Sequence, residues 1–556
     1  MILSPNRFGK LLIAILTRLL SNLNLFHMPA EKSLVIINEP FENMVLGKNA
    51  SLSYIAAALE LGHEVSIYNV PKTGPVFPES VTENMNVIKI DPNSHFAHNL
   101  VVEYKKKNME LKSFMEKATT ERSSEILQGY ENVKVSAISE ISGEELDRGQ
   151  TTNLAGVTNI IQRIEPMKAP FPPEGKSNLA EFLLKLKNNF PHLSFNCPIY
   201  EVDGEPQLLI DKDTPQRMNE LLEAAGRPLI ATPTREFKFG SDISEQFADM
   251  SEEYKSLFPR KDFGKLVLKP KDSAQSLGVF SIEFSNDEQA FDLESLKSTN
   301  LQSLKEAQIY KIKPSLDPSE LKQITEILCY AESMKLESNK TDFLEKSATP
   351  IGLIPEEEIT AVAKNLYDNE ILVQPFLEGV KSGDIRVNIF KNGDGDFELA
   401  GMTYRRSNRH TDDKFTTCLT TGGSSPFTTS ILEEAEKERL GENIKIMLGL
   451  LNNNPTLREK YQHSSEIGVD FLLQGDGKNV FLGEMNHHCP ALAPISEITN
   501  AMQSPETPYN SGGLAIAKTA IQGQIAQRKA PQESCRISST KAHTRESYLG
   551  KKSGFR

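Results

Sequence analysis

The chain has 556 residues, too many for one hydrophobic core, so we expect two or three domains. Its composition, 38% hydrophobic and 25% charged residues, is that of an ordinary globular protein and excludes a largely disordered chain. The net charge of −13 argues against a nucleic-acid-binding protein, because recognition of phosphate backbones requires a basic face.

The two ends of the chain differ from the rest. Residues 1–30 form an N-terminal extension whose apolar run is interrupted by Arg18 and is too short to span a bilayer. We expect either an amphipathic surface helix or a true start at Met28, and no membrane partner. Basic residues outnumber acidic ones in residues 526–556, which predicts a basic disordered tail.

The five cysteines are scattered and include no C-x-x-C pair. This spacing predicts neither a disulfide framework nor a zinc site, and it favours a reducing, cytoplasmic location.

Residues 33–38 form a short apolar run, residues 50–61 carry apolar residues at helical spacing up to Gly62, and residues 64–68 form a second apolar run. This is a strand–helix–strand unit, and it predicts a parallel α/β domain over residues 31–235. Residues 95–155 are charged and mostly helical in pattern, so we interpret them as an insertion in that domain.

From Leu266 the pattern changes to strands joined by glycine turns, and we expect a second domain over residues 236–525. A polar, helical insertion is predicted over residues 286–368. Residues 386–390 and 397–403 flank a Lys-Asn-Gly-Asp-Gly-Asp turn and form a predicted hairpin. The turn lacks the glutamate that closes a calcium loop, so a hairpin turn accounts for it.

Three motifs in this half suit an anionic ligand. Lys269 ends an apolar strand, where phosphate would compensate the cost of burying an ammonium group. Residues 371–377 run as a strand into Gln-Pro-Phe-Leu, and Arg386 begins the next strand. Arg405 and Arg406 precede a loop that contains Gly422 and Gly423. Taken singly, these motifs also fit a snorkelling lysine and ordinary surface loops.

The fourth motif is more specific. Asp470 lies in one apolar strand, and Glu484 and Asn486 lie two residues apart in the next, so both face the same side of the sheet. Hairpin pairing brings Asp470 to about the same position. Carboxylate and amide oxygens are the donors that Mg²⁺ prefers, whereas unpaired carboxylates on such apolar strands would be costly. The hairpin therefore predicts a magnesium site.

The running order of these motifs resembles that of the ATP-grasp ligases and, more specifically, that of bacterial glutathione synthetase. The resemblance also includes Asn38-Glu-Pro-Phe, Gln162-Arg163-Ile-Glu-Pro and Leu266-Val-Leu-Lys-Pro, and it spans roughly residues 33 to 520. It implies an α/β and α+β fold, in which a parallel α/β domain precedes an ATP-grasp domain of two α+β subdomains.

The resemblance also implies a reaction in which ATP phosphorylates a carboxylate and an amine then displaces phosphate to form an amide. Arg386 and Arg406 would be catalytic, Arg163 would lie near the peptide substrate, and Mn²⁺ could replace Mg²⁺. The nucleotide would contact Lys269, Gln374, Pro375, Phe376, Leu377, Lys381, Asp384, Gly422 and Gly423, and the metal would bind Asp470, Glu484 and Asn486.

Three departures keep the substrates open. The loop after Lys269 is Asp272-Ser-Ala-Gln-Ser-Leu277 rather than glycine-rich, the family's nucleotide lysine is replaced in Asn219-Glu220-Leu221, and residues 490–497 lack the family's glycine-binding arginine. We expect a glutathione synthetase that joins γ-glutamylcysteine to glycine. The alternatives are another amino-acid or peptide ligase and a catalytically weak nucleotide-binding protein. The expected partners are small molecules, with a homo-oligomer as an option.

Overall fold

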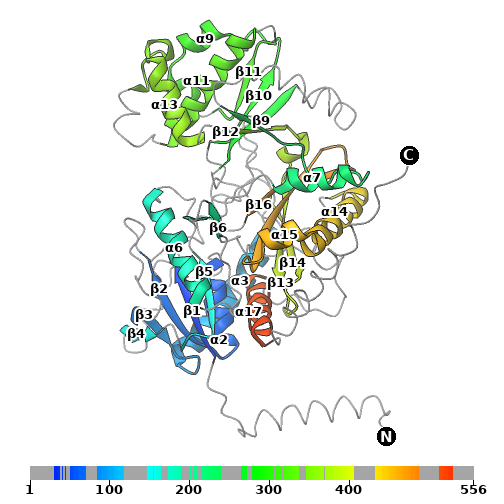
Figure 1. Cartoon of the computed structure of the whole chain (residues 1–556). Coiled ribbons are helices and arrows are strands. Elements are labelled where there is room, and N and C mark those ends of the chain that lie inside the picture. Colours follow the sequence, from blue (N-terminus) through cyan, green and yellow to red (C-terminus); the bar gives the residue numbers. More distant parts are fainter. Residues whose placement is uncertain are drawn as a thin grey trace, which may run out of the picture.

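The computed structural model describes a little over half of the chain, and Figure 1 draws the remainder in grey. The described residues are 31–37, 41, 44, 50–70, 84–117, 147–153, 156–163, 173–189, 199–202, 205–208, 214–238, 264–271, 278–305, 307–314, 317–336, 346–367, 370–405, 432–486 and 512–529. The two predicted extensions therefore lie outside them, except that residues 526–529 end a helix.

The first sheet has the strand order β4-β3-β2-β1-β5, with β1 parallel to both of its neighbours. The predicted parallel α/β arrangement is confirmed for this central part. Its strands are β1 (Lys32–Ile37), β2 (Glu64–Asn69), β3 (Asn84–Ile90), β4 (Asp147–Asn153) and β5 (Asn159–Arg163). Its helices are α2 (Ala50–Glu60), α3 (His95–Lys117) and α6 (Pro173–Asn189). A two-stranded sheet of β6 (Ile199–Val202) and β7 (Glu205–Leu208) follows.

Strand β1 is buried on both faces, as expected for a parallel strand covered by helices on either side. Leu34 and Ile36 pack with α6, whereas Val35 and Ile37 pack with α2 and α3. Helix α2 ends at Glu60, and Gly62 follows with a φ of +82°, which suits glycine. The predicted insertion of residues 95–155 contributes to this domain, because Phe96 and Leu100 of α3 enter its core and β4 forms an edge of its sheet.

The second sheet has the order β11-β10-β9-β12-β8 and forms the upper lobe in Figure 1. Its strands are β8 (Arg235–Lys238), β9 (Lys265–Pro270), β10 (Phe280–Phe284), β11 (Ile309–Ile312) and β12 (Glu370–Pro375). The helices of this lobe are α9 (Leu293–Ser298), α10 (Leu301–Leu304), α11 (Pro318–Leu336), η4 (Ile351–Leu353) and α13 (Glu356–Tyr367). Helices α11 and α13 bury one face of the sheet, so the predicted insertion of residues 286–368 supplies most of this lobe's core.

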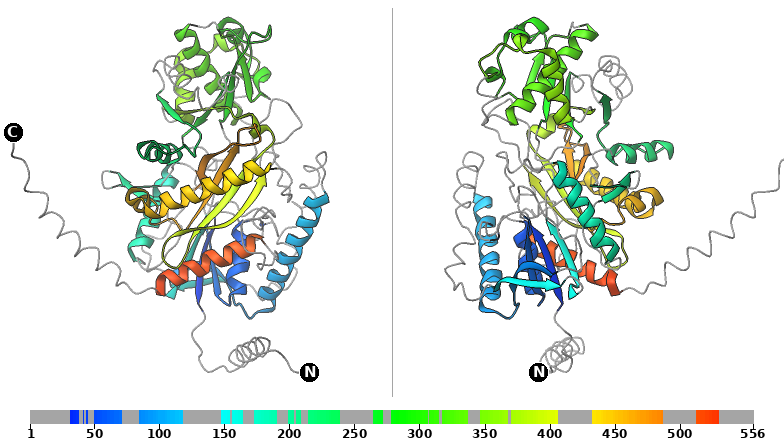
Figure 2. Two further views of the ribbon diagram at one scale, coloured as in Figure 1. Left: turned by 90° about the vertical axis from the view of Figure 1, so that its right-hand side faces the viewer. Right: turned by 60° about the vertical axis from the view of Figure 1, so that its left-hand side comes forward.

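The third sheet has the order β14-β13-β15-β16 and is antiparallel throughout. Its strands are β13 (Asp384–Lys391), β14 (Phe397–Arg405), β15 (Glu466–Leu473) and β16 (Val480–Asn486), so both predicted hairpins are confirmed. Helix α7 (Thr214–Ala224) and helix α14 (Glu434–Asn453) cover its apolar face. Helix α14 lies across the strands in Figure 2 and is followed by α15 (Pro455–Lys460).

The C-terminal helix α17 (Gly512–Lys529) returns to the first domain, where Figures 1 and 2 place it beside α2. Ala517, Ala520 and Ile521 of α17 share one hydrophobic core with α2 and with Phe390 of β13. The first and third sheets are thereby joined through this core.

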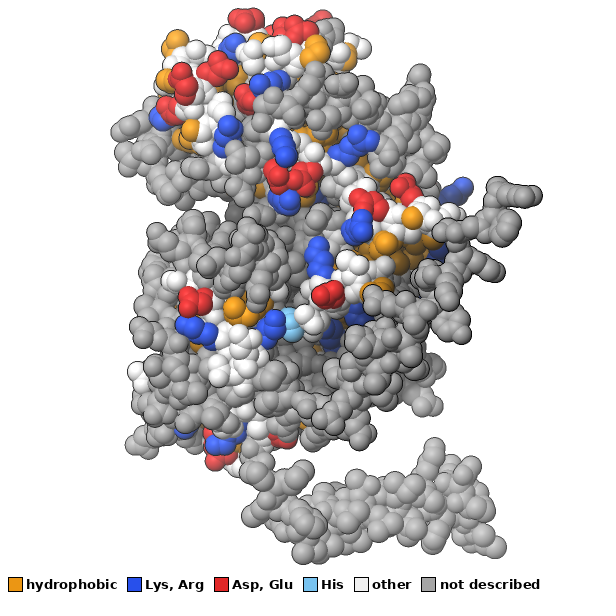
Figure 3. Space-filling model, viewed as in Figure 1, with side chains coloured by type: hydrophobic (Ala, Val, Ile, Leu, Met, Phe, Trp, Pro, Cys, Tyr) orange, Lys and Arg blue, Asp and Glu red, His pale blue; other side chains and the backbone are white. Residues whose placement is uncertain are grey.

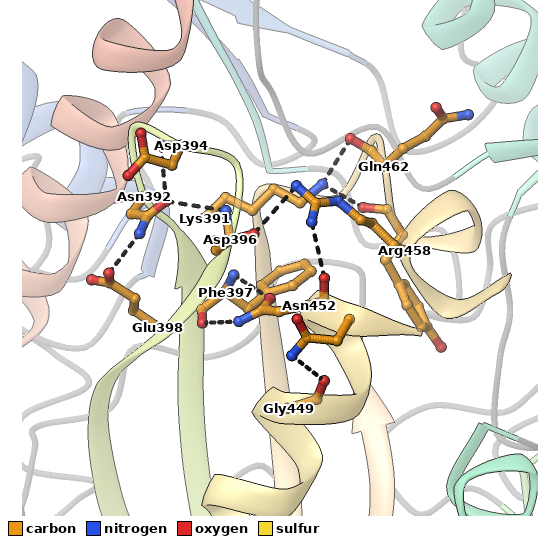
Figure 4. Close-up of polar contacts among 12 residues, drawn as sticks. Lys391, Asn392, Asp394, Asp396, Phe397, Glu398, Gly449, Asn452, Arg458 and Gln462 are labelled. Atoms are coloured by element: carbon orange, nitrogen blue, oxygen red, sulfur yellow. Dashed lines mark hydrogen bonds and ion pairs between the residues drawn. The ribbon is translucent and has the colours of Figure 1, made fainter. Parts of the chain in front are cut away.

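The turn between β13 and β14 docks on α14 and α15 through its own polar groups (Figure 4). The Asn392 amide oxygen accepts the N–H groups of Asp394 and Asp396, each at 3.0 Å, and Asp396 pairs with Arg458 at 3.3 Å. The Asn392 contacts stabilise the turn itself, and the Asp396–Arg458 pair holds it against α15.

Lys391 is buried at the start of this turn. Its Nζ donates to the carbonyl oxygens of Tyr461 at 2.6 Å and Gln462 at 2.7 Å (Figure 4). No carboxylate accompanies it among these contacts. Burial, with a smaller contribution from the positive charge of Arg458, lowers the pKa of Lys391 to about 7.

The low pKa of Lys391 predicts a pH dependence of stability. Between about pH 7 and pH 10.5 the unfolded chain binds a proton at this lysine that the folded chain does not. The free energy of unfolding should therefore rise with pH in this window, by up to about 1.4 kcal/mol per pH unit.

Urea denaturation across this window tests the effect, because Lys391→Met should remove this contribution while retaining most of the side-chain volume. Lys445→Met, at an exposed position of α14, serves as the control. Parallel pH profiles for the wild type and Lys391→Met would contradict the assignment.

Candidate functional site

The third sheet has one apolar and one charged face. Strand alternation directs Ile385, Val387 and Phe471 into the core beneath α14. The same alternation directs Asp384, Arg386 and Asp470 to the opposite face. Every residue of β13 is buried, so these charges lie inside the protein.

The central pair on this face joins β13 to β15. Arg386 is directly opposite Asp470 in the register, and its Nε and Nη2 both donate to that carboxylate, the second at 3.0 Å. Asp470 is in turn opposite Glu484 of β16, which confirms the predicted alignment of this hairpin. Arg386, Asp470 and Glu484 therefore form one row across three strands.

A second arginine reinforces this pair. Arg405, at the end of β14, donates to both oxygens of Asp384, at 2.7 and 2.5 Å. Its Nη2 also lies 2.9 Å from Asp470 Oδ1. In the register Arg405 lies opposite Asp384, one row away from Arg386. Arg406, which the sequence predicts to be catalytic, lies outside the described residues, so its role stays a prediction.

The two arginines determine the charge state of Asp470. Burial acts to raise the pKa of this carboxyl, but the charges and hydrogen bonds of Arg386 and Arg405 outweigh burial and lower it to about 2. Asp384 and Asp470 raise the pKa of Arg405 in the same way, against the effect of its burial. The network therefore holds Asp470 and Arg405 in their charged forms at neutral pH.

A bulge in β16 turns Leu482 and Glu484 toward opposite faces of the sheet. The register shifts between Asp470 and Phe471, so that Asp470 pairs with Glu484 and Phe471 with Leu482, and Gly483 is the extra residue. Leu482 consequently packs in the core, while Glu484 joins the charged face. A Cβ on Gly483 would lie 2.6 Å from the Leu472 side chain, so a larger residue here would require that side chain to move.

Asp470, Glu484 and Asn486 fit Mg²⁺ in the kind of donor that they offer. Asn486 lies opposite Gly468 on the charged face, and its Nδ2 donates to Asp470 Oδ2 at 3.3 Å. Both Asp470 oxygens thus already accept a hydrogen bond from Arg386; one of them also contacts Arg405, and the other also accepts from Asn486. A metal ion at Asp470 would have to replace some of these contacts. In the described part of the chain, no three His, Cys, Asp or Glu side chains converge on one point.

Of the residues predicted to contact the nucleotide, Lys269 lies on β9 and Gln374 and Pro375 on β12 of the second sheet. Lys265, Lys269 and Lys271 alternate along β9, so they share the face opposite the lobe's core. Lys269 is buried, with 6% of its surface exposed. Lys271 pairs with Glu370 at 3.0 Å and with Glu236 at 3.2 Å. Figure 3 shows neighbouring basic and acidic side chains at the lower edge of this lobe.

The segment after β12 connects the second and third sheets. Gln374 donates to Thr234 Oγ1 at 2.6 Å, and the Phe376 N–H donates to the Lys265 carbonyl at 3.1 Å. The Leu377 carbonyl accepts the Val380 N–H at 3.0 Å. These groups already have partners within the protein. Pro375 ends β12, and the assignment of this segment to the nucleotide remains a prediction.

A lysine–glutamate cluster stands at the same junction. Glu378, in the short helix η5 (Glu378–Lys381), pairs with Lys381 at 2.8 Å and with Lys265 at 3.0 Å. The two ammonium groups lie 5.7 and 5.6 Å from the centre of the Phe376 ring. Gly379 packs so closely on β15 that a Cβ there would lie 2.4 Å from the Leu473 carbonyl oxygen.

Several other predicted positions cannot be placed at the site. Gly422 and Gly423 lie outside the described residues, and so does the loop of residues 272–277. Arg163 ends β5, but its side chain is not among those described. Asn219 has a structural role, because its amide bonds the backbone of Ile230 and Ala231 and holds that segment beside β16.

Part of the chain matches a known protein family. Residues 332–506 match the family model described as YheC/D-like ATP-grasp. The matched segment contains β12 to β16 and hence the Arg386–Asp470–Glu484 row, but not Lys269. The match and the architecture confirm the predicted α/β and α+β fold and place this segment in the ATP-grasp superfamily.

The remaining comparisons add little to this assignment. No curated protein matches the chain. The chain is similar to the D-alanine-D-alanine ligase from Coxiella burnetii (TM-score 0.39, 10% identity, covering 92% of this chain and 100% of that chain). It is also similar to the VanG D-Ala:D-Ser ligase from Enterococcus faecalis (TM-score 0.38, 11% identity, covering 89% and 99%). Similarities this low carry no argument about activity. Among the described helices, none is both long and apolar enough to cross a bilayer.

The ion network predicts a large stability effect for Arg405→Met. The substitution leaves Asp384 buried without its bidentate partner, which should lower the free energy of unfolding by about 3 kcal/mol or more. Arg217→Met is the matched control, because Arg217 pairs with Glu220 on an exposed surface, and it should cost less than about 1 kcal/mol. Equal losses for the two variants in chemical denaturation would contradict this role of Arg405.

Proposed function

We propose that the protein is an ATP- and Mg²⁺-dependent ligase that joins a carboxylate to an amine through an acyl phosphate. The observation that carries this proposal is the Arg386–Asp470–Glu484 row, reinforced by Arg405, inside the segment that matches an ATP-grasp family. Two fixed guanidinium groups beside oxygen donors suit the transfer of a phosphoryl group.

In the proposed reaction a carboxylate oxygen attacks the γ-phosphorus of ATP, the bond to the bridging oxygen breaks, and ADP leaves. An amine nitrogen then attacks the acyl carbon, inorganic phosphate leaves, and the nitrogen loses a proton. Arg386 would stabilise the negative charge of the transferring group, and Lys269 would hold nucleotide phosphates. Mg²⁺, when bound by Asp470, Glu484 and Asn486, would neutralise charge on the phosphates. We assign no protein nucleophile to either step.

The leading substrate pair is γ-glutamylcysteine with glycine, which would make the protein a glutathione synthetase. This pair rests on the resemblance of the motifs in residues 374–386 and 468–486. Another amino-acid or peptide pair is the alternative within the same chemistry. A nucleotide-binding protein without turnover is a second candidate, favoured by the existing engagement of both Asp470 oxygens.

A phosphate-release assay with Mg²⁺-ATP separates these candidates. Pools of L- and D-amino acids and γ-glutamyl dipeptides are added to the purified protein. Release that requires both γ-glutamylcysteine and glycine supports glutathione synthesis, and release with another pair supports a different ligase. Nucleotide binding without release in any pool would overturn the proposed ligase activity.

Glu484→Gln tests the metal assignment. The substitution retains the shape but removes one negative charge from the row, and turnover should fall by about 100-fold or more. Thermal unfolding should show that the variant remains folded. Glu442→Gln, at an exposed position of α14, should retain activity. Unchanged turnover in Glu484→Gln would exclude Glu484 from metal binding.

A further inference from the structure

One buried amide on the charged face has no role in the scheme above. Asn388 lies two residues after Arg386 on β13, so its side chain projects from the same face. Its neighbours in the register are Gly401 on β14 and Gly468 on β15. Because neither glycine has a side chain, Asn388 is the only side chain in its row across these three strands.

Among the residues that the structure describes, the polar atoms of Asn388 have no partners. The residue is 3% exposed, and neither its Oδ1 nor its Nδ2 has a hydrogen-bond partner among the residues described. Native proteins pair nearly all buried polar side-chain atoms, so an amide with both ends unpaired requires an explanation. A ligand that pairs with both atoms supplies one.

The position of Asn388 along β13 indicates which part of a ligand would reach it. On one side lies the Arg386–Asp470 pair, about 7 Å away along the strand. On the other side Phe390 enters the core shared with α2 and α17, and Glu466 accepts the hydroxyl of Tyr54 from α2. Asn388 therefore lies between the residues assigned to phosphoryl transfer and the first domain.

The chemistry of the amide narrows the ligand class. Phosphate groups at neutral pH offer only acceptors, which would satisfy Nδ2 and leave Oδ1 facing negative charge. An amino acid offers an ammonium donor and a carboxylate acceptor, and a peptide bond offers an N–H and a carbonyl. Both place a donor and an acceptor close together, as the two ends of an amide require.

We propose that Asn388 binds the amino-acid or peptide substrate, with Oδ1 accepting from its nitrogen and Nδ2 donating to its carboxylate or carbonyl oxygen. Asn388 is thus a specificity-determining residue of the site, separate from the residues that hold ATP. This assignment rests on the proposed ligase function for its substrate class.

Asn388→Leu tests the proposal, because leucine has a similar shape but neither donor nor acceptor. Phosphate release is measured with Mg²⁺-ATP and the amino-acid and γ-glutamyl dipeptide pools. Binding of the same pools, with Mg²⁺ and a non-hydrolysable ATP analogue present, is followed by ligand-observed NMR. The KM for the amino-acid or peptide substrate should rise by about tenfold or more, while the KM for ATP stays within about twofold.

Two control variants make the comparison specific. Lys269→Met should show the opposite pattern, with a raised KM for ATP and an unchanged KM for the amino-acid or peptide substrate. Asn443→Leu removes another buried amide, whose Nδ2 bonds the Val480 carbonyl at 2.6 Å on the apolar side of the sheet. It should change neither KM. If Asn388→Leu does not fold, Asn388→Ser is measured in its place.

The outcomes distinguish this inference from the proposed function. An unchanged KM for the amino-acid or peptide substrate in the Asn388 variant, or an equal rise in both KM values, would overturn the inference and leave the ligase activity standing. Pool compounds that bind only when Asn388 is present, without phosphate release, would support the inference and sink the ligase proposal. Binding of no pool compound by the wild type would overturn the inference.

Discussion

The charged face of the third sheet depends on one compensated cluster, in which Arg386 and Arg405 surround Asp470 and Arg405 also holds Asp384. Burying any one of these charges alone would be prohibitive, since the loss of hydration greatly exceeds what a single neutral contact returns. Their mutual pairing lets a fully buried strand, β13, carry alternating charges on one side and core residues on the other. The cluster is therefore what allows a polar site to exist in the interior.

The same compensation constrains how the site can bind anything. An anion that drew Arg386 away from Asp470 would leave that carboxylate with less positive charge, and the low pKa of Asp470 shows how much it relies on its partners. A cation beside Asp470 would restore the balance. Binding an anionic phosphate together with a cation keeps the positive and negative charges of the site balanced, whereas binding either ligand alone leaves an excess of one charge. This coupling follows from electrostatics alone and does not depend on which carboxylate or amine is joined.

Strand alternation was sufficient to predict that Glu484 and Asn486 share a face and that Asp470 lies beside them. It could not predict the bulge at Gly483, which lets Leu482 and Glu484 face opposite ways although they are two residues apart. Nor could it predict that Arg405 pairs with Asp384, because that pairing depends on the register of β14, which a second irregularity shifts near Asn388. The predicted role of Arg406 stays a prediction, because this residue lies outside those described. The region of residues 286–368 looked peripheral because its apolar residues are interleaved with charges, yet they assemble into the core of the upper lobe.

Strand β13 also links the upper lobe, the third sheet and the first domain. Asp384, Arg386 and Asn388 follow one another along its charged face, starting next to the junction with the upper lobe. Phe390, the next position on that face, is packed in the core of the first domain. These four positions are separated by fixed steps of one strand repeat, about 7 Å each. In the proposed ligase this strand, which is packed at both ends, would set the separation between the nucleotide and the second substrate. Since proximity and orientation would supply much of the rate in the proposed reaction, we expect the packing of Phe390 to affect turnover although this residue would touch no reactant.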